Sequence, residues 1–191
     1  FTRAVELEVA NFDFGGESGS AGASLSKLGS NRFRIQLSHA PNHPEWPNLC
    51  QFTLTGAAGA SLRLEGASAG LRQFGSWSYD RVNWNPVIPD GSGGITFPQF
   101  TRDTIYFGCE VPFSHEMILE HLAAWESHPD ATIHYLGDSL QGRPIYRLTV
   151  ADPSGPYAEE SRWVHHFVNQ HTDEGNAIWR IAGAVDWLGA T

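Results

Sequence analysis

Basic residues are scarce in this sequence. It has 12 Lys and Arg against 21 Asp and Glu, which gives a formal net charge of −9 at pH 7. Nucleic acids and anionic membrane surfaces attract proteins that present clustered basic residues, and the basic residues here are not clustered. The charge balance therefore argues against nucleic acid and against an anionic membrane as partners.

Long apolar runs are also absent. No stretch approaches the roughly 20 apolar residues of a membrane-spanning helix, and no basic-then-apolar signal segment opens the sequence. Its 191 residues are 41% hydrophobic and 17% charged, a composition typical of folded proteins. We therefore expect one large domain or two small ones with a real hydrophobic core.

Cysteine is rare, with only Cys50 and Cys109 in the whole sequence. Their spacing matches no metal-binding cysteine motif. We expect them to be buried thiols in a reducing compartment, which favours the cytoplasm. A single disulfide is the alternative.

The first hundred residues predict an antiparallel β-sandwich. Short segments in which apolar and polar residues alternate, or in which apolar residues run together, are separated by Gly-rich turns, as in such sandwiches. The predicted strands are residues 3–9, 32–37, 50–54, 60–64, 76–82 and 95–97. Aromatic residues are frequent here, and they predict core packing, with a carbohydrate-binding platform as the alternative. They are Phe12, Phe14, Trp46, Trp77, Tyr79 and Trp84.

The pattern changes after residue 101, where strands and helices alternate. A strand over 103–111 is followed by a helix over 114–127, which Ser114 can cap because its hydroxyl accepts an early backbone N–H. Strands over 131–136 and 145–150 then form a hairpin. This order of elements is typical of an α/β domain.

A further apolar strand over 163–168 ends at the most informative stretch, which contains His171 and Glu174. A helix is predicted directly afterwards, over 177–188. Ligand sites of open α/β sheets lie at the carboxyl ends of strands, and an imidazole nitrogen with a carboxylate oxygen suits Zn²⁺. The spacing and context thus indicate a metal site, with an ordinary polar turn as the alternative.

Three stretches of the sequence resemble one known family. They are residues 106–114 (YFGCEVPFS), 136–145 (LGDSLQGRPI) and 170–176 (QHTDEGN). Together they resemble the M14 zinc metallocarboxypeptidases, and among these the cytosolic carboxypeptidase subfamily with its bacterial relatives. The resemblance implies a β-sandwich N-terminal domain over 1–108, followed by the first part of a mixed-sheet carboxypeptidase α/β domain over 109–191.

The resemblance also implies a chemistry. His171 and Glu174 would be two zinc ligands of an enzyme that hydrolyses C-terminal residues of peptides or proteins. The Pro-Gly that the family has between these ligands is Thr172-Asp173 here. We expect Asp173 to be solvated, with a supporting contact to the metal ligands as the alternative. The family's third ligand, a His, and its general-base Glu are expected beyond Thr191. The chain is therefore expected to be a fragment with an incomplete active site and no catalytic residue of its own.

Two other functional classes stay open at this point. An aspartoacylase-like zinc amidohydrolase uses the same His-x-x-Glu scheme, although the predicted β-domain in front argues against it. A non-catalytic β-sandwich binding module with a peptidase remnant is the other. The sequence does not indicate the oligomeric state.

Overall fold

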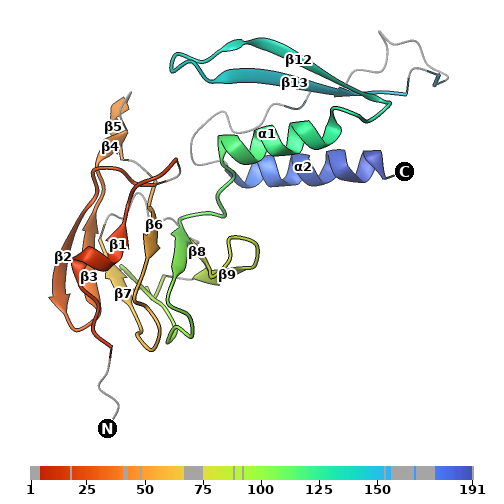
Figure 1. Cartoon of the computed structure of the whole chain (residues 1–191). Coiled ribbons are helices and arrows are strands. Elements are labelled where there is room, and N and C mark those ends of the chain that lie inside the picture. The colour runs from red at the N-terminus through yellow and green to blue at the C-terminus, as the bar shows by residue number, and fades with distance from the viewer. Residues whose placement is uncertain are drawn as a thin grey trace. The chain divides into compact units, whose positions relative to one another are not determined.

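The computed structural model describes residues 5–17, 19–40, 43–47, 49–66, 75–87, 89–91, 93–152, 154–155, 166 and 175–190. Over these residues the chain is mostly β-strand, with two α-helices. It divides into two compact units, Phe1–Pro112 (unit 1) and Phe113–Thr191 (unit 2), which can be followed by colour along the chain (Figure 1).

Unit 1 contains two main sheets. The first has the strand order β1-β6-β11-β8-β9 and the second β10-β7-β3-β2. The first consists of β1 (Phe12–Asp13), β6 (Gln51–Leu54), β11 (Ile105–Gly108), β8 (Gly75–Ser78) and β9 (Trp84–Val87). The second consists of β10 (Gly94–Thr96), β7 (Arg63–Glu65), β3 (Arg32–Gln36) and β2 (Ser24–Gly29). The short strands β4 (His39–Ala40) and β5 (His43–Pro47) pair separately.

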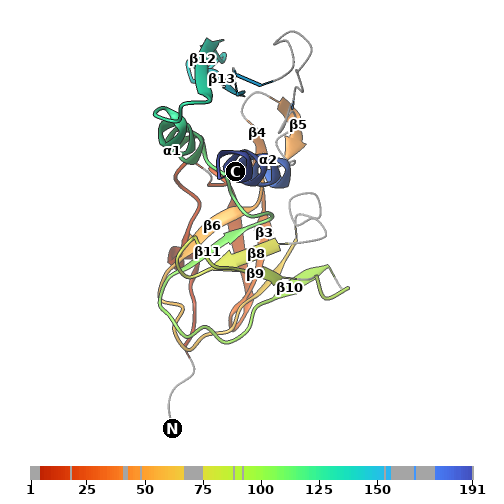
Figure 2. The same cartoon turned by 90° about the vertical axis from the view of Figure 1, so that its right-hand side faces the viewer.

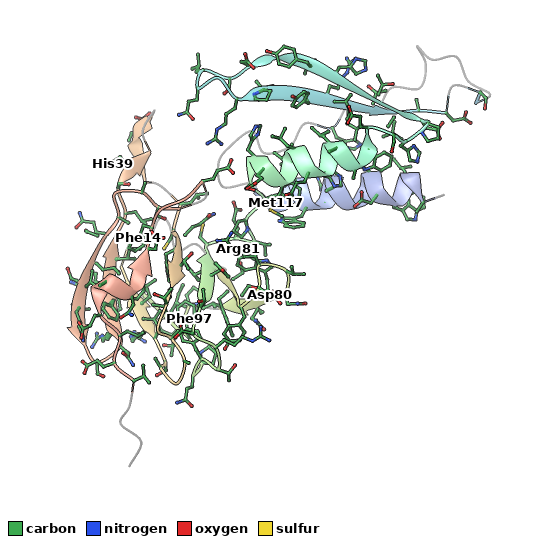
Figure 3. The ribbon with its side chains drawn as sticks, viewed as in Figure 1. Phe14, His39, Asp80, Arg81, Phe97 and Met117 are labelled. Atoms are coloured by element: carbon green, nitrogen blue, oxygen red, sulfur yellow. The ribbon has the colours of Figure 1, made fainter. Side chains whose placement is uncertain are left out.

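Aromatic side chains join the two sheets through one core. The ring of Phe12 on β1 lies 5.0 Å from that of Phe33 on β3. Phe97, which follows β10 and points into unit 1 (Figure 3), lies 5.4 Å from Phe107 on β11. The first contact connects strands of different sheets, and the second connects the residue after β10 with a strand of the other sheet. The inner faces of the two sheets therefore pack on each other. The prediction that these aromatic residues form a core is confirmed for Phe12 and for Trp77, which are both buried.

The strand predicted over residues 3–9 is wrong where the structure describes it. Residues Val9–Asn11 form a 3-10 helix, and residues 5–8 are irregular. Leu7 is fully buried, as the alternating pattern predicts. Its backbone N–H, however, donates to Asn31 Oδ1 at 2.7 Å and not to a neighbouring strand. The Asn31 amide in turn donates to the Val5 carbonyl at 2.8 Å. A side chain thus takes the place of a strand partner.

A turn built on Asp80 shortens the strand predicted over 76–82. Its carboxylate accepts the backbone N–H groups of Val82 and Asn83 at 2.9 and 2.8 Å, so β8 ends at Ser78. Asp80 and Arg81 are labelled at this turn in Figure 3. The Asn83 side-chain amide, together with these backbone groups, holds the pKa of Asp80 well below its usual value.

One strand pair departs from the predicted antiparallel arrangement. Strand β3 pairs with β7 in parallel, with Phe33 opposite Leu64. The two strands are separated by a long connection that passes through β6 of the other sheet. A long crossover permits parallel pairing, whereas a tight hairpin does not.

Unit 2 contains helix α1 (His115–Trp125), the hairpin of β12 (Ala131–Asp138) and β13 (Pro144–Val150), and helix α2 (Gly175–Gly189). The predicted cap is confirmed, because the Met117 N–H donates to Ser114 Oγ at 3.1 Å. The two helices lie side by side in both views (Figure 1 and Figure 2). Neither of the two described α-helices is long and apolar enough to cross a membrane.

The shared core of unit 1 predicts a large penalty for truncating Phe33, whose side chain is 0% exposed. Phe33→Ala should lower the free energy of unfolding by about 3–5 kcal/mol, through lost burial and the cavity left behind. Urea unfolding followed by circular dichroism measures this change. Val82→Ala is the control, because Val82 is 79% exposed and its truncation should cost about 0.5 kcal/mol or less. Equal effects of the two variants would contradict the assigned core.

Candidate metal centre

The two predicted zinc ligands, His171 and Glu174, lie outside the residues that the structure describes. So does the strand predicted over 163–168, except for His166, which is exposed. These assignments stay predictions. What the structure does place is helix α2, whose first residue, Gly175, directly follows Glu174 in the sequence. The packing of α2 therefore bears on how the candidate centre is held.

Aromatic packing holds the first half of α2. The ring of Trp179 lies 4.6 Å from that of Phe113, with an angle of 74° between the ring planes. Such an edge-to-face contact is favourable beyond the area that it buries. Phe113 directly precedes Ser114, the residue that caps α1. This contact therefore ties the start of α1 to the half of α2 that is nearest the predicted ligands.

A buried tryptophan holds the second half of α2. Trp125, the last residue of α1, is only 6% exposed, and its indole N–H donates to Asp186 Oδ1 at 3.3 Å. A side chain at position 189 would collide with the Trp125 ring, because a Cβ built on Gly189 would overlap the ring carbons. The absence of a side chain at Gly189 thus lets α2 approach α1 closely.

Two histidines of unit 2 take part in the same helix contact. His121 Nε2 lies 3.6 Å from Asp186 Oδ1, which is longer than a hydrogen bond. The His128 ring lies 4.7 Å from that of Trp125, and its Nδ1 accepts the Asp130 N–H at 3.2 Å. Since Nδ1 accepts, Nε2 carries the proton and donates to the Gly189 carbonyl at 3.4 Å. These imidazoles therefore serve the packing of the helices.

The described residues contain no group of three or more His, Cys, Asp or Glu side chains that could hold a metal ion. This result does not cover His171 and Glu174.

Sequence reasoning missed the contact between Asp186 and Trp125. The feature of the sequence that could have indicated it is the single acidic residue within the apolar stretch 184–188.

No protein-family model and no curated protein sequence matches this chain. Solved structures of bacterial enzymes do match its fold. A metallo-carboxypeptidase from Burkholderia cenocepacia superimposes with a TM-score of 0.63 and 24% sequence identity, over 76% of this chain and 40% of that one. A metallo-carboxypeptidase from Pseudomonas aeruginosa, in complex with (2-guanidinoethylmercapto)succinic acid, gives a TM-score of 0.57 and 19% identity, over 75% and 41%.

These likenesses show the fold. The chain has a carboxypeptidase-like fold, and it spans about two fifths of the length of the structures that it matches. The β-rich architecture with two helices agrees with the α/β class predicted from the sequence. The identities are too low to carry the chemistry of these proteins over to this chain.

The contact of Asp186 with the helix pair can be tested by substitution. Asp186→Ala should lower the free energy of unfolding by about 1 kcal/mol, because it removes the hydrogen-bond acceptor of the Trp125 indole N–H. Asp186→Asn keeps an oxygen acceptor and should lose less than half of that. Urea unfolding measures both changes, with Glu120→Ala on the exposed side of α1 as the control. An Asp186→Ala protein as stable as the control would rule out this role.

Proposed function

We propose that this chain is part of a zinc-dependent metallocarboxypeptidase, of the cytosolic carboxypeptidase-like subfamily within the M14 family. The observation that carries the proposal is the fold likeness to the Burkholderia cenocepacia metallo-carboxypeptidase over 76% of the chain. The sequence adds a His-x-x-Glu pair directly before helix α2. The proposed substrate is the C-terminal residue of a peptide or protein.

The chemistry of the donors fits the proposed metal. A histidine nitrogen and a glutamate oxygen are ordinary Zn²⁺ ligands, and a catalytic zinc site takes three protein ligands and keeps one position open. His171 and Glu174 supply two of the three in our proposal, and the third ligand and the general base come from sequence beyond Thr191. When bound, the zinc supplies Lewis acidity, which polarises a carbonyl and lowers the pKa of a bound water.

The position of Glu174 suits its proposed role. It directly precedes Gly175, the first residue of α2. The N-terminus of a helix carries partial positive charge from the aligned peptide dipoles, and this charge favours an ionised carboxylate. In our proposal Glu174 binds the metal as the ionised carboxylate. His171 must bind through a neutral ring nitrogen, and its other nitrogen needs an acceptor; we assign this acceptor to Asn169 or a backbone carbonyl.

The surface of unit 2 supports the proposal that this chain is part of a larger domain. Among its described residues Trp125 is the single large apolar side chain that is buried. Trp187 and Leu188 on α2 are 66% and 51% exposed, and Tyr135 and Leu136 on the hairpin are each 60% exposed. Several large apolar side chains exposed on one small unit are typical of surfaces that other polypeptide covers. We infer that the rest of the catalytic domain packs there.

The proposed location of the protein is the cytoplasm. Both cysteines carry thiols in this structure, as is usual for proteins of reducing compartments.

Substitution of His171 tests the proposed function in the full-length protein. His171→Ala should remove bound zinc and reduce peptidase activity to background, because two remaining ligands hold zinc weakly. Zinc content is measured by mass spectrometry of the metal, and activity by release of C-terminal amino acids from peptides. His166→Ala, an exposed histidine in the same stretch, should keep both zinc and activity.

Two kinds of peptide substrate complete this experiment. Peptides with a free C-terminus should be hydrolysed, and the same peptides with an amidated C-terminus should not. Hydrolysis of N-acyl amino acids without any action on peptides would instead indicate an aspartoacylase-like amidohydrolase. Retained zinc and activity in His171→Ala would refute the ligand assignment. A full-length protein that holds zinc in neither form would indicate a binding module.

A further inference from the structure

The two cysteines of the chain face each other at the end of the larger sheet of unit 1. Strands β11 and β6 are antiparallel, and Gly108 lies opposite Gln51. The next position along the ladder brings Cys109 opposite Cys50, and there the Cys109 N–H donates to the Cys50 carbonyl at 2.9 Å. Directly opposite residues of an antiparallel pair project from the same face of the sheet. Both side chains therefore point into the same space.

Burial agrees with this placement. Cys50 is fully buried within the hydrophobic core of unit 1, and Cys109 is partly buried and packs against that core. The two positions form a hydrogen-bonded cross-strand pair, in which the Cα atoms are about 5.5 Å apart. Disulfides join cysteines whose Cα atoms are about 4.4–6.8 Å apart. Directly opposite Cβ atoms of such a pair are about 4.5–5.5 Å apart, and a disulfide needs about 3.5–4.5 Å. A bond between these sulfurs therefore requires side-chain rotation and a closer approach of the two strands at this end of the ladder.

The two thiols differ in reactivity. Burial raises the pKa of the Cys50 thiol far above its usual value, and the facing Cys109 raises it further. Cys50 is consequently protonated and shielded from solvent. Cys109 is the more accessible of the two, and accessible thiols react first with oxidants in solution.

We propose that Cys50 and Cys109 are a reversible disulfide-forming site, oxidised by exchange with a small-molecule disulfide such as oxidised glutathione. The Cys109 thiolate attacks one sulfur of that disulfide, and the other sulfur leaves as a thiolate. Cys50 then loses its proton to solvent and attacks the Cys109 sulfur of the mixed disulfide, which releases the second small thiol. The two cysteines lose two electrons and two protons, and the small disulfide gains them as two thiols.

This bond would tie the two strands together across the segment of residues 51–108. A covalent link restricts the unfolded chain more than the folded chain, and a long enclosed segment increases the effect. Unit 1 should therefore become more stable when it is oxidised. Because Cys50 must be exposed and deprotonated to react, bond formation should be slow at neutral pH and faster at alkaline pH.

The test uses the full chain treated with oxidised glutathione. Peptide mapping without reductant should find Cys50 linked to Cys109, with both thiols lost together. The melting temperature should rise by about 10 °C, and dithiothreitol should reverse both changes. Cys109→Ala is the matched control, because it removes the accessible thiol and leaves the core residue in place. Its melting temperature should not respond to oxidised glutathione.

Three results would overturn the proposal. The first is a lasting glutathione adduct on Cys109 while the Cys50 thiol persists. The second is a disulfide that links two chains. The third is an internal Cys50–Cys109 bond that lowers the melting temperature, because it would show that the folded pair cannot take the bond without distortion.

Discussion

Burial of apolar side chains is divided unequally between the two units, and the rest of the structure depends on this division. Unit 1 encloses a core to which both of its sheets contribute, with aromatic rings in contact across the layers. Among the described residues of unit 2, the only large apolar side chain that is buried is Trp125. Because apolar burial is the dominant favourable term in folding, unit 1 has its own source of stability. Unit 2 buries far less and relies on the contacts of α2 at Trp179 and at Trp125.

The contact at Trp125 combines several weak interactions around one ring. Trp125 has an acceptor in Asp186, a neighbouring imidazole in His128 and a close backbone in Gly189. Each interaction needs the others, since the indole N–H finds its acceptor only if α2 comes close, and α2 comes close only because position 189 has no side chain. The helix that starts directly after the proposed ligands is thereby held near both of its ends, at Trp179 and at Asp186.

Local features of the sequence predicted local structure well. The cap at Ser114, the hairpin of β12 and β13 and helix α2 were all expected, because each depends on residues close together in the chain. Apart from the local turn at Asp80 that shortens β8, the failures involve distant residues. Residues 5–9 alternate like a strand, yet their partner is the side chain of Asn31. The parallel pairing of β3 with β7 likewise follows from a long connection and not from a pattern within either strand.

The same distinction applies to the candidate site: the sequence indicates ligands that are close together in the chain, but not those that are far apart. His171 and Glu174 can be recognised in the sequence because they are three residues apart and precede a helix, so local geometry alone can bring them together. A third ligand and a general base have no such local signature, because only the completed sheet brings them to the metal. In our proposal the exposed apolar surface of unit 2 and its incomplete set of ligands have one cause. In this proposal, further polypeptide packs on α2 and on the hairpin. The same folding event then buries the exposed apolar side chains and supplies the missing metal ligand.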